Sequence, residues 1–371
     1  MTVHLHWFLP TSGDGRTIVE RFHANKSLGP AAVRQPDIDY LAQIARAAEQ
    51  LGFEGVLTPT GTWCEDAWLT TAALIRETTR LKYLVAFRPG VISPTLAAQM
   101  AGTYQRISGG RLLLNVVTGG DAVEQRRFGD WHDHDARYAR TDEFLSIVRG
   151  VWSGKPFDFV GDHLSVEGAT TLAVPDPLPQ VYFGGSSPAA LPVAARHADV
   201  YLTWGEPPAQ VVDKIQRVRE LAGGRDIRFG IRLHTISRDT SEEAWREAGK
   251  LLDALDPAQV RRAQEQLAAS ESVGQQRMVA LHNGALNGDV HSLEIYPNLW
   301  AGVGLVRGGA GTALVGSHEE VADRIEEYYA LGVEEFIFSG YPHLEEAYWF
   351  GEGVRPLLAS RGLLERALVV V

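Results

Sequence analysis

Short apolar segments recur along the chain, and longer amphipathic stretches separate them. Most of these segments are continuous runs of β-branched, aromatic and leucine residues, without alternation between apolar and polar positions. Such runs are typical of strands that are buried on both faces of a parallel sheet. The pattern predicts eight strands, over residues 3–9, 54–58, 82–87, 112–117, 180–183, 199–203, 227–233 and 335–339.

The stretches between the strands carry apolar residues at helical spacing, as in Tyr40, Ile44 and Ala48 before the helix-stopping Gly52. Eight strand–helix units without a break in composition predict a single (β/α)8 TIM barrel over residues 1–371. A doubly wound open sheet is the alternative architecture. We expect the second helix to bury Leu69, Ala72, Ala73 and Ile75, and the third to bury Leu96, Met100, Tyr104 and Ile107. Later helices are predicted near residues 141–152, 188–197, 208–222, 241–255 and 318–331.

Two insertions interrupt this pattern. Residues 157–174 resemble an extra β-hairpin before the fifth strand. Residues 256–316, between the seventh and eighth strands, begin with a helical pattern and then become rich in glycine and asparagine. Long segments of this kind in compact domains are usually lids or binding loops, so we expect a lid here.

Composition narrows the possible functions. The 371 residues carry a formal net charge of −11, which argues against a nucleic-acid or anionic-membrane binder. The N-terminus lacks a basic and apolar leader, and no apolar run approaches the roughly 18 residues of a membrane span, so we expect a cytoplasmic protein. Cys64 is the single cysteine, which excludes an intrachain disulfide and a cysteine-based zinc site.

The active site of such a barrel lies at the carboxyl ends of the strands. Basic and aromatic residues gather at these positions, whereas carboxylates are scarce. The scarcity disfavours a glycosidase, which needs two facing carboxyl groups, and a divalent-metal hydrolase, so no metal is expected. The basic residues predict an anion pocket and the aromatic residues a site for a flat ring, formed by Arg88, Arg232, His234 and His343 and by Trp7, Trp204 and Tyr341 respectively.

A phosphate site is one interpretation of residues 183–188, which read FGGSSP. Glycines let the backbone approach a ligand closely, hydroxyls donate hydrogen bonds, and the following helix would point its N-terminus at the phosphate. A plain Gly-Ser turn that caps the next helix explains the same residues equally well.

Eight segments resemble the FMNH2-dependent alkanesulfonate monooxygenases, a group of bacterial-luciferase-like barrels. The resemblance spans nearly the whole chain, and the glycine-rich segment and the Tyr-Pro-His motif separate this group from luciferases and from deazaflavin-dependent relatives. The segments are WFLPTSGDG (7–15), PTGTWCEDAWL (59–69), NVVTGGD (115–121), YFGGSS (182–187), YLTWGEPP (201–208), RFGIRLH (228–234), NLWAGVGLVRGGAGTALVG (298–316) and FSGYPHLEEAY (338–348).

The resemblance implies a two-component flavin monooxygenase. A separate NAD(P)H-dependent FMN reductase would supply FMN in its reduced form, FMNH2, and O2 would provide the oxygen atom that cleaves the C–S bond of an organosulfonate. The products would be sulfite and an aldehyde. Relatives form homodimers or homotetramers, so the resemblance also implies a homo-oligomer.

The resemblance assigns site residues by position. Cys64, Trp204, Arg232, His234, Arg307 and Tyr341 match residues that line the active site, with Arg307 on a mobile lid. These roles suit a permanent anion, because arginines remain protonated at working pH and offer forked donors. The flavin would contact Asn115, Tyr138, Gly185, Ser186 and Ser187, and the strand-end position adds Ala86 and Arg88.

The chain departs from this family pattern beside the substrate end. Ser12 stands where the alkanesulfonate enzymes have histidine, and the loop over residues 16–36 is longer. These differences leave the substrate open. A polar sulfonate or a sulfosugar such as sulfoquinovose is an alternative to an alkanesulfonate, and a sulfone-type monooxygenase is an alternative reaction.

Overall fold

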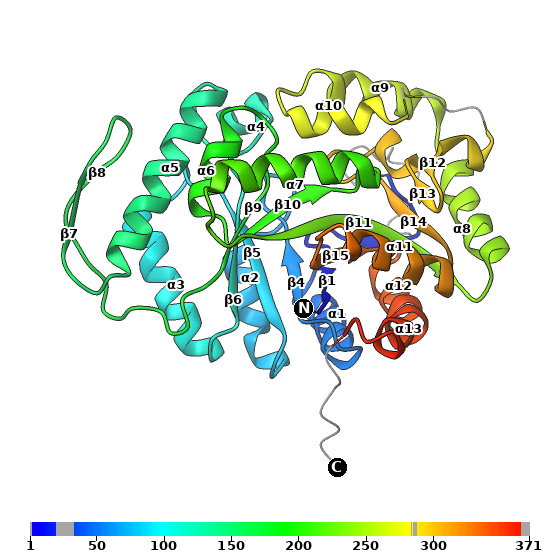
Figure 1. Ribbon diagram of the computed structural model, residues 1–371, viewed down its shortest axis with the longest axis horizontal. Helices are drawn as coiled ribbons and strands as arrows, with labels where there is room; N and C mark the ends of the chain where they lie inside the picture. The colour runs from blue at the N-terminus through cyan, green and yellow to red at the C-terminus, as the bar shows by residue number, and fades with distance from the viewer. Residues whose placement is uncertain (1, 20–32, 283, 285–287, 365–371) are drawn as a thin grey trace, which may run out of the picture.

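A closed barrel of eight parallel strands forms the centre of the molecule. The computed structural model describes residues 2–19, 33–282, 284 and 288–364. Strand β10 pairs with both β9 and β11, which closes the sheet into a ring and confirms the predicted (β/α)8 architecture (Figure 1). Around the ring the strands are β1 (His4–Phe8), β4 (Gly55–Thr58), β5 (Lys82–Phe87), β6 (Leu112–Val116), β9 (Val181–Phe183), β10 (Val200–Trp204), β11 (Arg228–Arg238) and β15 (Glu335–Ser339).

Both faces of these strands are buried, which explains their continuous apolar sequences. Side chains that point inward form a compact interior core, and those that point outward pack against the surrounding helices. The interior core contains Leu57, Leu84, Leu113, Tyr182, Val200 and Ile337. The barrel interior is therefore packed with side chains, and ligands must bind at its ends.

A charged cluster fills the amino end of the barrel. The Glu335 carboxylate accepts a hydrogen bond from the Tyr182 hydroxyl at 3.0 Å, lies 2.7 Å from His6 Nε2 and pairs with Arg228. Burial alone would raise the pKa of Glu335, but the hydrogen bond and charge of His6 and the charge of Arg228 lower it. This cluster lies at the opposite end from the predicted site, where barrel residues serve stability.

Helices cover the outside of the barrel, and several begin at a side-chain cap. Asp37 accepts a hydrogen bond from the Tyr40 amide at the start of α1, and Ser93 caps α3 in the same way. The main helices are α1 (Ile38–Gln50), α2 (Ala67–Leu74), α3 (Pro94–Ser108), α5 (His134–Val151), α6 (Ala190–His197), α7 (Pro208–Ala222), α8 (Ser241–Asp253), α11 (His318–Ala330), α12 (His343–Trp349) and α13 (Arg355–Ser360). No described helix is long and apolar enough to cross a membrane.

Details of three predicted helices are wrong. Helix α5 begins at His134, well before residue 141, because Asp133 caps its first turn. In α2 the predicted core residue Leu69 is 75% exposed, and the neighbouring Trp68 is buried instead. In α3 Leu96 and Ile107 are exposed. Tyr104 is buried as predicted. The rest of the buried face consists mainly of small residues that apolar spacing did not identify: Ala97, Ala98, Ala101 and Gly102.

The predicted hairpin is present, as the antiparallel strands β7 (Phe157–Val160) and β8 (Ser165–Ala169). The longer insertion has secondary structure of its own. It contains α9 (Pro257–Ala268), α10 (Val273–Ala280), two 3-10 turns (Val290–Leu293 and Gly302–Leu305) and strands β12 (Glu294–Tyr296), β13 (Leu299–Trp300) and β14 (Ala313–Ser317).

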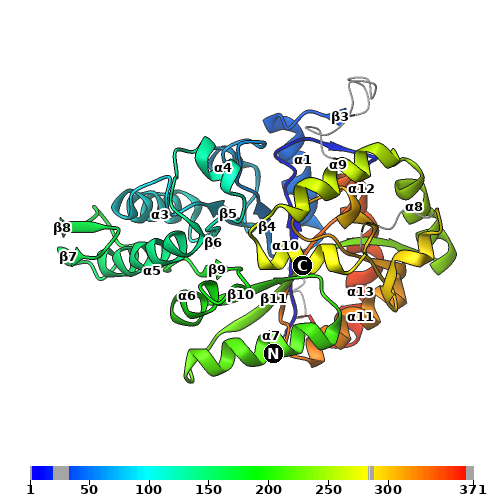
Figure 2. The same ribbon diagram turned by 90° about the horizontal axis from the view of Figure 1, so that it is seen from above.

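Strand β11 extends beyond its predicted end and pairs there with β14, which attaches the insertion to the barrel. Helices α9 and α10 lie across the top of the molecule in Figure 1, and seen from above α10 lies over the region where the strands meet (Figure 2). The insertion thus covers the carboxyl ends of the strands. The role of the insertion as a lid stays a prediction. In the long first loop, which was also predicted, residues 20–32 lie outside the described residues.

Candidate active site

The order of strands around the barrel separates the predicted site residues into two groups. Arg232 and His234 lie on β11, and Trp204 ends the adjacent β10. Ala86 and Asn115 are register partners on the adjacent strands β5 and β6, across the barrel from β11. The site therefore has one side on β10, β11 and β15 and another on β5, β6 and β9.

Arg232 is the central cation of the first side. Its Nη1 donates to the carbonyl oxygens of Leu233, at 2.6 Å, and Ile337, at 3.4 Å, and its Nη2 donates to Ser339 Oγ at 2.8 Å. The guanidinium also lies over the Phe8 ring, 4.8 Å from the centroid. Burial lowers the pKa of Arg232 to about 10, so the group stays charged at neutral pH. Within the described chain these contacts use three of the five N–H groups of an arginine, which leaves two for a ligand.

His234 is buried beside Arg232 and is electrically neutral. Its Nε2 lies 3.0 Å from the carbonyl oxygen of Ala310, and its Nδ1 lies 2.6 Å from Ser339 Oγ. Burial and the charges of Arg232 and Arg307 hold the pKa of His234 well below its ordinary value. A carbonyl oxygen only accepts hydrogen bonds, so Nε2 carries the proton.

Arg307 and Tyr341 complete this side. The Arg307 guanidinium lies over the Tyr341 ring, 5.2 Å from its centroid, and the same ring stacks against His234 with centroids 5.3 Å apart. Arg307 follows the buried 3-10 turn Gly302–Leu305 of the insertion. The structure thus brings four predicted residues from three separate segments together: Arg232, His234, Arg307 and Tyr341.

The insertion also closes over Trp204. A Cβ atom built on Gly274 of α10 would lie 3.1 Å from Trp204 Cζ3, so this glycine allows the helix to sit directly on the indole ring. Thr312 Oγ1 donates to the carbonyl oxygen of Gly205 at 2.6 Å. These contacts hold the glycine-rich part of the insertion against the end of β10.

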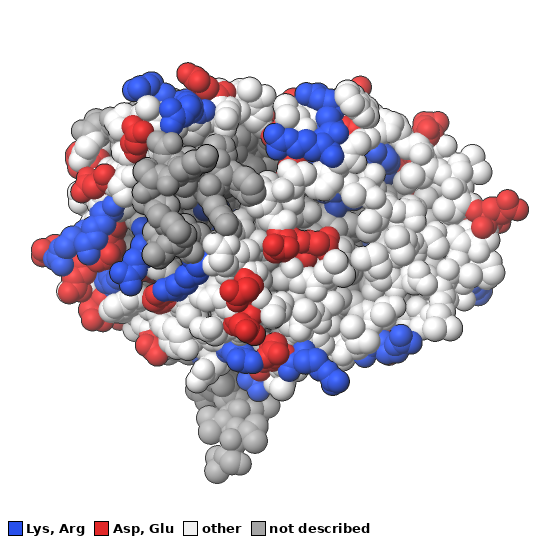
Figure 3. Space-filling view, turned by 180° about the vertical axis from the view of Figure 1, so that it is seen from behind, with Lys and Arg blue, Asp and Glu red and all other residues white. Residues whose placement is uncertain are grey.

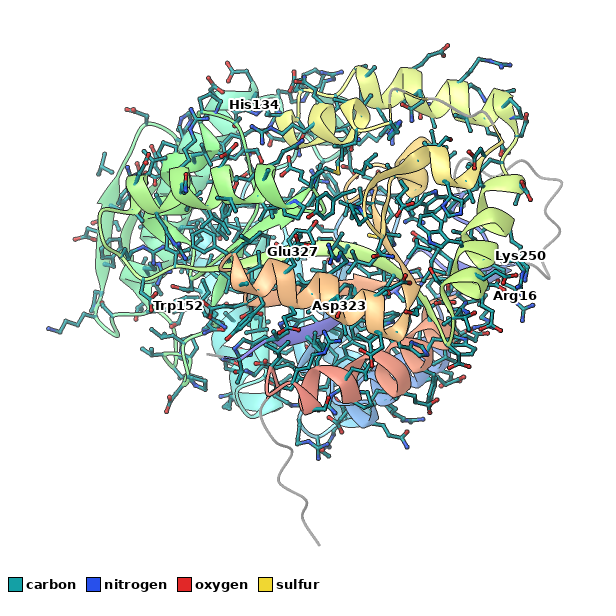
Figure 4. The ribbon with its side chains drawn as sticks, turned by 45° about the vertical axis from the view of Figure 1, so that its right-hand side comes forward. Arg16, His134, Trp152, Lys250, Asp323 and Glu327 are labelled. Carbon is teal, nitrogen blue, oxygen red and sulfur yellow. The ribbon has the colours of Figure 1, made fainter. Side chains whose placement is uncertain are left out.

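The second side of the site contains the Gly-Ser loop. Tyr138, on α5, has a hydroxyl hydrogen-bonded with Ser187, and burial raises the pKa of this tyrosine. The Tyr201 hydroxyl donates to the carbonyl oxygen of Gly185 at 2.7 Å. A Cβ atom on Gly185 would lie 2.7 Å from Ala190 Cβ and 3.2 Å from Tyr138 Oη, so only glycine permits this close approach. Figure 4 places His134, at the start of the same helix, on the side of the molecule where α10 lies.

Arg88 belongs to this second side and does not join the anion pocket around Arg232. Its Nη2 pairs with Glu124 at 2.5 Å, and its guanidinium lies 5.3 Å from the centroid of the Phe128 ring. Its Nε and Nη1 are buried and have no hydrogen-bond partner in the described part of the chain. The prediction that one anion pocket includes both Arg88 and Arg232 is wrong, because β5 and β11 lie on opposite sides of the barrel.

The structure also places the remaining predicted residues Trp7, His343 and Cys64. Trp7 does not flank the site, because it points outward and packs between Phe53 and Phe350. His343 lies beside the site, with its ring centroid 5.2 Å from that of Tyr341, but its Nδ1 lies 2.8 Å from Asp14 Oδ1. Burial raises the pKa of the Cys64 thiol to about 12, so it is protonated at neutral pH and is no thiolate nucleophile.

Sequence reasoning missed Ser339 and Phe8, which both contact Arg232. The alternation of side chains along a strand could have found them. Glu335 and Ile337 point into the barrel, so Ser339 does as well, and Trp7 points outward, so Phe8 points inward. The missing information was which set of alternate residues faced the interior.

Fold and site together define a (β/α)8-barrel protein with a basic and aromatic site under a glycine-rich insertion. The chain matches the model of the luciferase-like monooxygenases over residues 3–335 and belongs to that family.

Solved structures with the same fold include a riboflavin lyase with modified FMN and riboflavin (20% identity, 98% of this chain and 93% of that chain, TM-score 0.80). A long-chain alkane monooxygenase is 18% identical, with 98% of this chain and 93% of that chain covered and a TM-score of 0.78. The EDTA monooxygenase of Chelativorans sp. BNC1 is 19% identical, with 100% of this chain and 96% of that chain covered and a TM-score of 0.75.

Proposed function

We propose that this protein is a two-component monooxygenase that uses reduced FMN and O2 to cleave the C–S bond of an organosulfonate. The observation that carries the proposal is the presence of two arginines in one site: Arg307 lies over the Tyr341 ring, and both residues act electrostatically on the buried Arg232. Two arginines at one end of the barrel suit a permanent anion, because their charge persists at working pH and their N–H groups match the oxygens of a sulfonate.

The proposed reaction balances with one O2 and one reduced flavin. A sulfonate R–CH2–SO3⁻ gives R–CHO and HSO3⁻, while the flavin is oxidised and one oxygen atom leaves as water. The flavin, when bound, supplies the two electrons and activates O2. The protein must therefore hold the sulfonate beside the flavin, keep bulk water out and leave a path for protons.

The described residues fit a flavin on the β5–β6–β9 side. Gly185, Ser186, Ser187 and Tyr138 would hold its phosphate, because the loop offers hydroxyls and a close backbone approach. The two buried and unpartnered N–H positions of Arg88 supply further donors on this side, two residues after Ala86, the register partner of Asn115. Orphaned buried donors are rare in proteins, so they support a ligand at this place.

Arg232 and Arg307 would bind the sulfonate oxygens, and Tyr341 and Trp204 would form the walls of the pocket. The neutral His234 would keep Arg232 in place and is available to accept or pass a proton only after its Ser339 bond breaks. α10 and the segment around Arg307 cover the strand ends and would exclude water from the reacting groups.

Sulfite release tests the proposal directly. The purified protein would receive FMN, an NAD(P)H-dependent flavin reductase, O2 and a panel of alkylsulfonates, aromatic sulfonates and sulfosugars. We expect sulfite in proportion to NAD(P)H with at least one class, and the preferred class identifies the substrate. The control is Ser237→Ala, which changes a buried serine outside the site and should leave sulfite release unchanged.

The Arg232→Ala and Arg307→Ala variants separate the sulfonate reaction from a sulfone reaction. Loss of sulfite release in both supports an anionic substrate. Oxygenation of a sulfone that persists in both variants, without sulfite from any sulfonate, would overturn the proposal in favour of a sulfone-type monooxygenase.

A further inference from the structure

Ser339 joins the two polar groups at the centre of the proposed sulfonate site. It is the last residue of β15, and its side chain is completely buried. Its Oγ accepts a hydrogen bond from Arg232 Nη2 at 2.8 Å and lies 2.6 Å from His234 Nδ1. A fully buried hydroxyl between a guanidinium and an imidazole has few alternative partners, so its orientation is fixed by these two.

The direction of each hydrogen bond in this cluster follows from one carbonyl group. The Ala310 carbonyl only accepts, so His234 donates from Nε2, and its neutral ring must accept at Nδ1. The hydroxyl proton of Ser339 therefore points at Nδ1, and its lone pairs face Arg232. A continuous chain of hydrogen bonds, each donated toward the next group, runs from Arg232 through Ser339 and His234 to the Ala310 carbonyl.

The last member of this chain belongs to the insertion. Ala310 lies three positions after Arg307. The same segment is held on its other side by α10, where the Gly309 amide donates to Gln275 Oε1 at 2.9 Å. The hydrogen-bonded chain thus connects the barrel arginine of the site with the segment that carries the second arginine.

We propose that Ser339 is a positioning residue whose hydroxyl couples the docking of residues 307–312 to the placement of Arg232. The sulfonate role of Arg232 rests on the proposed function, whereas the coupling itself is a property of the resting protein. Without the hydroxyl, Arg232 loses one anchor and His234 loses the group that orients its ring. The bond to Ala310 then weakens, because a ring without a fixed orientation no longer presents Nε2–H to the carbonyl.

The coupling is tested first without turnover. Ser339→Ala is compared with Ser237→Ala, which removes an equally short serine–histidine contact, 2.6 Å to His318 Nδ1, away from the site. We expect hydrogen exchange of the 307–312 amides to quicken about two- to tenfold in Ser339→Ala only, as for the loss of one net hydrogen bond. Exchange that is unchanged, or equally faster in the control, would overturn the coupling.

Nitrogen NMR of histidine-labelled protein gives a second readout. The His234 signals are identified by their loss in His234→Gln. In the native protein we expect a protonated Nε2 and a hydrogen-bond-accepting Nδ1, and in Ser339→Ala a shift of Nδ1 toward a mixture of ring states. An unaltered Nδ1 signal would show that Ser339 does not orient this ring.

Turnover then tests the consequence for substrate. With the sulfonate identified by sulfite release, we expect Ser339→Ala to raise KM about tenfold with a smaller change in kcat, and to lower the sulfite formed per NAD(P)H. A KM equal to that of Ser237→Ala would refute the positioning of Arg232. If no sulfonate reacts with the native protein, the proposed function fails, while the exchange and NMR results still decide the coupling.

Discussion

Arg232 has a geometry that lysine cannot reproduce. Its guanidinium contacts two carbonyl oxygens, the Ser339 hydroxyl and the face of the Phe8 ring at once. A lysine ammonium is a single point charge without a planar fork. We expect Arg232→Lys to lower kcat/KM for the sulfonate nearly as much as Arg232→Ala, about 100-fold, as for truncation of a buried charged partner.

Steady-state sulfite release measures this effect, and thermal unfolding checks that both variants are folded. Full recovery of kcat/KM in Arg232→Lys would show that charge alone is needed, and that the forked donors are not.

Cys64 provides a prediction against covalent catalysis. Its thiol is partly buried, its Sγ lies 3.6 Å from the Gly61 carbonyl oxygen, and burial raises its pKa to about 12. Since almost no thiolate exists at neutral pH, we expect Cys64→Ser to retain turnover within about threefold and the native thiol to react slowly with iodoacetamide at pH 8. Rapid alkylation that abolishes activity would contradict this.

At the scale of elements, the Gly-Ser loop between β9 and α6 depends on a glycine. A methyl group on Gly185 would collide with Ala190 and approach the Tyr138 hydroxyl, so Gly185→Ala must displace the loop. We expect the Kd for reduced FMN to rise at least about tenfold, measured by anaerobic fluorescence titration.

Gly249→Ala is the matched control, because Gly249 lies inside α8 with no atom within 4 Å of the added Cβ. There alanine should leave flavin affinity unchanged and raise the free energy of unfolding by about 0.5–1 kcal/mol. Equal flavin affinity in Gly185→Ala and the native protein would remove this loop from the proposed cofactor site.

The helices show how well apolar periodicity predicts which face of a helix is buried. The apolar face of α1 was predicted correctly, because Tyr40, Leu41 and Ile44 mark it beside its buried alanines. The buried face of α3 was predicted only in part: Tyr104 is buried, but alanines and a glycine form most of this face while Leu96 and Ile107 face outward. Small residues carry little hydrophobic signal, so only the packing of α3 shows which face is buried.

For the whole molecule, buried carboxylates predict instability in acid. The pKa values of Asp14 and Glu335 are lowered from ordinary values of 3.8 and 4.5 in spite of burial, by His343 for Asp14 and by His6 and Arg228 for Glu335. A carboxyl group with a lowered folded-state pKa stabilises the protein above its unfolded pKa, and this contribution is lost as the pH falls through the folded value.

Urea unfolding between pH 7 and pH 3 should therefore show a falling free energy of unfolding below about pH 4.5. Glu335→Gln should lower stability at pH 7 by about 3 kcal/mol, since it leaves His6 and Arg228 without their carboxylate, and should flatten the acid dependence. An unaltered pH profile in Glu335→Gln would show that this cluster contributes nothing to acid sensitivity.

Assembly is the remaining prediction at this scale. Leu69 and Ile107 are exposed on α2 and α3, and Figure 3 shows few charged side chains on the side of the molecule where α3 lies. We expect a homodimer or homotetramer of the 40.6 kDa chain, measured by light scattering, and a lower mass for Ile107→Glu. A monomer at micromolar concentration would contradict this.

The sequence by itself determined the series of eight strand–helix units, because strands buried on both faces produce continuous apolar runs whose order does not depend on distant contacts. The pairing of β10 with β11 then closed these strands into a barrel and excluded the open sheet. It also placed the basic and aromatic residues at strand ends. Only the tertiary structure decided which of them meet. Closure of the ring placed Arg88 across the barrel from Arg232. The way each strand's alternating side chains face the interior pointed Trp7 outward and Ser339 inward. The insertion then brought Arg307 onto Tyr341. These outcomes depend on pairings between residues far apart in the chain, which local patterns do not record.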